Sequence, residues 1–135
     1  YAKMQSIFTT VRALGGGVTL AWMIHGTAAA LMSAWVFVAW RGQTSFALKA
    51  AILSVGAVVC APHAYMYDLV VLAVPAAFLL RDGRERGFLR YELAALAGAC
   101  LLLLSFPLFK APLGLGATLI VAALIARRWI FAAQR

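Results

Sequence analysis

The chain has 135 residues, of which 65% are hydrophobic and only 12% are charged. Soluble domains are roughly half apolar and about a quarter charged, so the composition excludes a typical soluble domain and predicts an all-α integral membrane protein. The net charge of +8 does not indicate a nucleic-acid partner, because the arginines flank apolar runs and are expected to contact membrane lipids.

The first segment, residues 1–17, is predicted to form a short amphipathic helix in the outer interface of the membrane. Apolar side chains recur at helical spacing, polar side chains form a second stripe, and a glycine run can end the helix. The apolar positions are Met4, Ile7, Phe8, Val11 and Leu14, the polar ones are Gln5, Thr9 and Arg12, and the glycines are Gly15–Gly17.

About five membrane helices are expected after this segment, at 18–40, 46–61, 65–80, 91–109 and 113–131. Residues 18–40 would extend about 35 Å, enough to cross a bilayer with some tilt. Small residues are expected to let the later helices pack closely, and these are Ala95, Gly98, Ala99, Gly114 and Gly116.

Residues 46–80 are treated as two short helices because of their length. One helix of this length would extend about 52 Å, against a hydrocarbon core of about 30 Å. Pro62 is expected to end the first helix. The connection would lie below the membrane surface and line a cavity, since irregular backbone at that depth needs protein or water around it.

The loop 81–90 carries four arginines and is interpreted as a solvated cytoplasmic turn. With five spans, nine basic residues lie inside and three lie outside, the outside ones being Lys3, Arg12 and Lys110. A single span over 46–80 also gives nine against three, so charge does not separate the alternatives. Length and the polar insertion favour five spans, with residues 62–68 facing outward.

The stretch AKMQSIFTTVRALG, then a long span, then APHAYMYDLVVL, resembles the C-terminal part of glycosyltransferase family 87. These are bacterial multi-pass membrane enzymes of the GT-C architecture. The resemblance covers nearly the whole chain and is carried by Met4, Ser6, Arg12, Gly15, Pro62, Tyr67 and Asp68.

The resemblance implies an enzyme of the bacterial cytoplasmic membrane. Such an enzyme transfers a hexose, often mannose, from a polyprenyl-phosphate sugar to an acceptor outside that membrane. It also implies a catalytic aspartate in an outward loop that precedes the present chain. The chain is therefore expected to be a C-terminal fragment that is inactive alone.

The substrate-binding candidates are Asp68, Tyr67, His63, Arg12, Gln5 and Ser6. Asp68 is the only acid expected on the outer side and could orient a hydroxyl or act as a base. Its alternative roles are an ion pair, for example with Arg12, and a simple interfacial position. Arg12 could bind the donor phosphate or lipid headgroups. His63 could donate to phosphate or be a satisfied loop histidine, and Tyr67 could stack on a sugar or anchor the interface.

Other expectations concern His25, metals and the competing functions. His25 is expected to make an interhelical hydrogen bond. No metal-ligand cluster or cofactor motif is evident, and metal dependence and oligomeric state stay open. A transporter segment, which would use broken helices, and a structural membrane subunit are the alternative functions. A structural subunit would tolerate replacement of Asp68 or Arg12.

Overall fold

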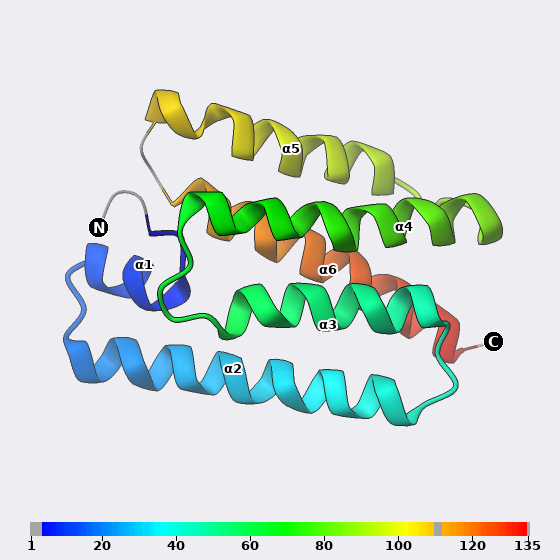
Figure 1. The fold of residues 1–135 in the computed structure, drawn as a ribbon, viewed down its shortest axis with the longest axis horizontal. Coiled ribbons are helices and arrows are strands. Elements are labelled where there is room, and N and C mark those ends of the chain that lie inside the picture. Colours follow the sequence, from blue (N-terminus) through cyan, green and yellow to red (C-terminus); the bar gives the residue numbers. More distant parts are fainter. Residues whose placement is uncertain (1–3, 110–111, 135) are drawn as a thin grey trace.

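The computed structural model describes residues 4–109 and 112–134. In these ranges the regular structure is helical, apart from one isolated antiparallel bridge between Met4 and Tyr65. Helices α2 to α6 run lengthwise side by side, and α1 folds against the N-terminal end of α2 (Figure 1). The elements are α1 (Ile7–Ala13), α2 (Val18–Arg41), α3 (Phe46–Cys60), the 3-10 helix η1 (Met66–Leu72), α4 (Ala73–Arg86), α5 (Glu92–Phe109) and α6 (Leu113–Ala133).

The all-α prediction is confirmed, and four of the five predicted helices agree with α2, α3, α5 and α6 within two residues at each end. The predicted helix 65–80 is wrong in two ways, because it opens with the 3-10 turn η1 and α4 continues to Arg86. Ion pairs one helical turn apart, Arg81–Glu85 and Arg86–Asp82, support the extra turn. Gly87, with φ +88, follows that turn as the C-cap.

The predicted break between α3 and α4 is confirmed. Pro62 cannot continue a helix, and the residue before it, Ala61, is extended with ψ 114, as residues before proline tend to be. The Asp68 carboxylate then accepts from the Tyr65 amide at 2.8 Å, which starts η1 as a helix cap. The chain therefore reverses, and α3 and α4 lie next to each other (Figure 1).

The buried core lies along α3, which packs against α2, α4 and α6, while α5 packs against α6. Its largest side chains include Leu48, Ile52, Val55, Leu79 and Ile125. The outer faces of the bundle instead expose large apolar side chains, among them Leu31, Phe37, Leu101, Leu104, Leu108, Leu119 and Ile130. An apolar surface of this extent is uncommon on soluble monomers.

Among the described residues, two helices are long and apolar enough to cross a membrane, Val18–Arg41 and Leu113–Ala133. Only 11% of the most apolar window of α2 is buried, whereas a core helix of a soluble protein is mostly buried. The other apolar helices are shorter, at Phe46–Cys60 and Glu92–Phe106.

The expected packing role of the small residues holds at Gly114 of α6 and Ala99 of α5 but not at Gly98 of α5. A Cβ on Gly114 would overlap the Leu69 side chain, so this glycine lets α6 approach η1 closely. A Cβ on Gly98 would meet no described atom within 4 Å, so the packing role predicted for Gly98 is wrong. Ala99 is buried as expected.

Candidate functional site

The first described residues are joined to the break between α3 and η1. Met4 pairs with Tyr65 as an antiparallel bridge, and the Gln5 amide donates to the Ala64 carbonyl at 2.7 Å. The Ser6 hydroxyl donates to the Pro62 carbonyl at 2.5 Å. The two stretches that carry the family resemblance, far apart in sequence, therefore meet at one end of the bundle, here called the break end (residues 4–17 and 61–68).

Ser6 is fully engaged in holding this junction. It is the N-cap of α1, and its Oγ accepts from the Thr9 amide at 3.2 Å. Since its single hydroxyl proton goes to Pro62, the Thr9 hydroxyl must donate to Ser6 Oγ across their 3.0 Å contact. Both acceptor positions and the donor of Ser6 are thus occupied, and the side chain is only 4% exposed.

Gln5 connects the break end to α6. Its side chain is buried, and its Oε1 accepts from the Gly114 amide at 2.9 Å. Amides in the first turn of a helix have no partner within that helix, so Gln5 satisfies one of them. Gln5 and Ser6 therefore position the break, a role that a polar stripe in a sequence does not reveal.

Asp68 and Arg12 are engaged separately. Asp68 is half-buried, with Oδ2 bonded to the Tyr65 amide. Arg12 donates through Nη1 to the Gly16 carbonyl at 2.9 Å, just beyond the C-terminus of α1. Among the described residues no salt bridge joins Asp68 to Arg12, so the ion pair considered from sequence is wrong.

Two tyrosines stand beside the Asp68 carboxylate. The Tyr65 and Tyr67 rings are stacked, with centroids 5.3 Å apart and planes 7° from parallel. Tyr67 is 71% exposed, so much of its ring surface is open. An exposed aromatic ring beside a fixed carboxylate offers both an apolar contact and a hydrogen-bond acceptor, a combination that suits a sugar.

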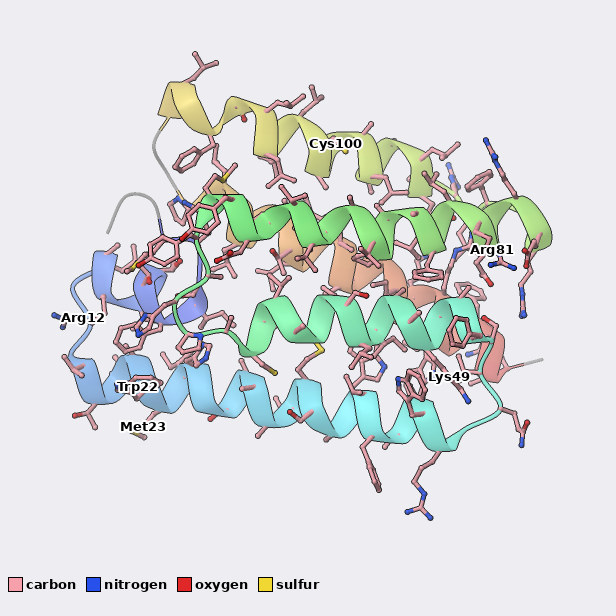
Figure 2. All side chains as sticks on the ribbon, viewed as in Figure 1. Arg12, Trp22, Met23, Lys49, Arg81 and Cys100 are labelled. Atoms are coloured by element: carbon pink, nitrogen blue, oxygen red, sulfur yellow. The ribbon has the colours of Figure 1, made fainter. Side chains whose placement is uncertain are left out.

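His63 is exposed and belongs to an aromatic wall on the same end. Its ring centroid lies 5.7 Å from Phe8 and 6.4 Å from Trp22, edge-on in both cases. The wall joins α1, α2 and the break. Trp22 is labelled near the same end in Figure 2, on α2 below Arg12.

His25 makes the interhelical hydrogen bond expected of it. Its Nε2 lies 3.3 Å from the Cys60 carbonyl at the end of α3. Because a carbonyl oxygen accepts, Nε2 carries a hydrogen and is the donor. In the described part of the chain Nδ1 is buried without a hydrogen-bond partner. His25 thus satisfies a C-terminal carbonyl of the broken helix.

An apolar groove is lined in part by the residues that follow Asp68 in the sequence. Its volume is about 310 Å³, and it lies between η1 and α4 on one side and α5 and α6 on the other. Leu69 and Val70, the next residues after Asp68, belong to its lining, and its other lining side chains are apolar except for Cys100. The residues of the polar break end are therefore followed directly in the sequence by residues that line the apolar groove.

The opposite end holds a buried charge cluster that sequence reasoning missed. Arg128 Nη1 donates to Asp82 at 2.7 Å, and its Nε and Nη2 both donate to Glu92, the latter at 2.6 Å. All three side chains are at most 5% exposed. The interpretation of 81–90 as a solvated turn is therefore wrong for residues 81–86, which belong to α4, and for Asp82, which lies inside the bundle, whereas most of the segment is exposed.

Basic side chains concentrate at that same opposite end, here called the arginine-rich end. Figure 2 labels Lys49 and Arg81 there and Arg12 at the other end. Lys3, Lys110 and Arg135 lie outside the described residues. The basic side chains of the arginine-rich end are Arg41, Lys49, Arg81, Arg84, Arg86, Arg90, Arg127 and Arg128.

Within the described ranges, no group of three or more His, Cys, Asp or Glu side chains is placed to hold a metal ion. No family model, curated protein or solved structure matches this chain.

Proposed function

We propose that this chain is part of a bacterial membrane glycosyltransferase that moves a hexosyl group from a polyprenyl-phosphate sugar to an acceptor outside the cytoplasmic membrane. The observation that carries the proposal is the junction of residues 4–6 with the break at 61–65. This junction places Asp68, Tyr67 and His63 on one end of the bundle, beside an apolar groove.

Membrane placement is supported by the lengths of α2 and α6 and by the exposed apolar surface. In this proposal α3, the η1–α4 pair and α5 complete five spans. Eight of the described basic residues lie at one end and Arg12 at the other. The positive-inside rule then puts the arginine-rich end in the cytoplasm and the break end outside.

Asp68 and Tyr67 are proposed to contact the sugar or the acceptor hydroxyl. The Tyr65 amide holds Asp68 Oδ2, which fixes the carboxylate and leaves Oδ1 to accept a hydrogen bond from a hydroxyl. Arg12 uses one guanidinium nitrogen at Gly16, so its remaining N–H groups can bind a phosphate oxygen.

The groove beside Leu69 is proposed to take the first isoprene units of the carrier. Its apolar lining suits a hydrocarbon tail, whereas the sugar phosphate would remain with the polar groups at the break end. The acid or base that completes the reaction is expected upstream of this chain, as the family resemblance implies.

The test is sugar transfer by membranes containing the full-length protein, supplied with hexosyl polyprenyl phosphates. Asp68→Asn keeps an oxygen to cap η1 but removes the charge, and we expect a fall of about tenfold or more, typical of a lost charged hydrogen bond. Tyr67→Ala should also slow transfer. Glu85→Gln, an exposed acid at the other end, is the control and should be silent. Full activity in both test variants would reject the site.

A further inference from the structure

The arginine-rich end combines eight basic side chains with three acidic ones, Asp82, Glu85 and Glu92. Two of these acids, Asp82 and Glu92, are buried against Arg128. Only Glu85 is exposed, in a 2.9 Å pair with Arg81. The buried cluster therefore removes most of the negative charge from the surface and leaves an almost wholly cationic end.

The cations lie at the border of the apolar surface. Three guanidinium groups sit over aromatic rings, Arg41 over Phe37 at 5.3 Å, Arg90 over Tyr91 at 4.7 Å and Arg127 over Phe131 at 5.9 Å. The three rings are between 47% and 67% exposed. Exposed aromatic rings with cations over them, at the border of an apolar surface, are typical of the headgroup level of a bilayer.

The loop that carries Arg90 is held in place. Arg127 donates to the Arg90 carbonyl at 2.6 Å, and Arg128 donates to the Gly87 carbonyl at 3.1 Å. Tyr91 has φ 65, a conformation that a residue other than glycine keeps only when its surroundings hold it. The cationic surface is therefore preorganised.

We propose that the arginine-rich end is a docking surface selective for anionic phospholipid headgroups. An acidic headgroup would satisfy the exposed arginines while its acyl chains cover the adjoining side chains Leu80, Leu93 and Ile130, which are 40–51% exposed. A soluble polyanion would satisfy the charges but leave these apolar side chains in water. The inference rests on the membrane placement proposed above and not on the transferase reaction.

The test uses the full-length protein in phosphatidylcholine bilayers that contain phosphatidylglycerol, with a photoactivatable diazirine on one lipid or the other. Crosslinked peptides are mapped by mass spectrometry. We expect phosphatidylglycerol to be enriched at least about fivefold over phosphatidylcholine on peptides of the arginine-rich end, since each surface arginine favours an anionic leaflet by about that factor.

The combined variant Arg81→Gln, Arg84→Gln and Arg90→Gln changes exposed side chains only and should clearly lower this enrichment. The part that remains is expected from the basic side chains that the variant keeps, Arg41, Lys49, Arg86 and Arg127. Arg12→Gln, at the break end, should leave it unchanged. Equal crosslinking of both lipids in the unmodified protein would overturn the proposal while leaving the membrane placement intact. If added RNA or an added acidic protein removed the phosphatidylglycerol crosslinks, that result would also overturn the proposal. Absence of crosslinks from both lipids along α2 and α6 would instead refute the membrane placement.

Discussion

Gly114 is the point at which α6 meets the break end, and Gly114→Ala tests that contact. The Gly114 amide donates to Gln5 Oε1 at 2.9 Å. An added Cβ would overlap Leu69 Cδ1 and lie 3.1 Å from both Cγ and Oε1 of Gln5. Leu69 is 2% exposed and adjoins Asp68, so the side chain cannot move without disturbing the candidate site.

The expected effect is a loss of about 1–2 kcal/mol. Overpacking a closed core costs about 1–3 kcal/mol. The helix-propensity gain from Gly to Ala is at most about 1 kcal/mol in a helix interior and smaller here, because Gly114 lies in the first turn of α6. Gly98→Ala is the matched control. Its Cβ would meet no atom of the described residues within 4 Å, so it should gain about 0.5–1 kcal/mol.

Equilibrium unfolding in mixed micelles, followed by circular dichroism during titration with dodecyl sulfate, measures both variants. We expect them to differ by about 1.5–3 kcal/mol, with Gly114→Ala the less stable. Hydrogen exchange should also show a faster Gln5 amide in Gly114→Ala. Equal stability of the two variants would mean that α6 does not pack on η1 as described.

Two further changes test the ends of the bundle. Arg128→Met removes the cationic partner of the buried Asp82 and Glu92 and should destabilise the protein by about 3–5 kcal/mol. Adding Asp82→Asn and Glu92→Gln should restore most of this stability in the same unfolding assay. If Arg128→Met alone lay within about 1 kcal/mol of the parent, the three side chains would not form the buried cluster described. Ser6→Ala removes the α1 cap and the bond to Pro62 and should cost about 1–2 kcal/mol locally, seen as faster hydrogen exchange at Gln5 and Thr9. Thr27→Ala, which loses only a bond within α2, should leave that exchange unchanged.

The break and most of the helices follow from local rules, and the sequence therefore predicts them; the exceptions are the 3-10 turn η1 and the extra turn of α4. Apolar runs of span length predict α2, α5 and α6. The excessive length of 46–80 and the chemistry of Pro62 predict the reversal after Cys60. These features depend on neighbouring residues, so no tertiary information is needed.

The buried cluster and the roles of Gln5 and Ser6 depend on contacts between distant segments. Arg128 looks like an interfacial residue at the end of a span until Asp82 and Glu92 are brought to it from α4 and α5. Gly98 and Gly114 look alike in sequence, and only the position of Leu69 separates them. Long-range partners of this kind leave no periodic signal.

Accessibility of the two ends in living cells tests the central claim most directly. In full-length protein with Cys60 and Cys100 replaced by serine, His63→Cys and Glu85→Cys each place one thiol at an exposed position. We expect a membrane-impermeant maleimide to label the His63→Cys variant in intact bacteria and the Glu85→Cys variant only after permeabilisation. Labelling of the His63→Cys variant only from the cytoplasmic side would contradict it.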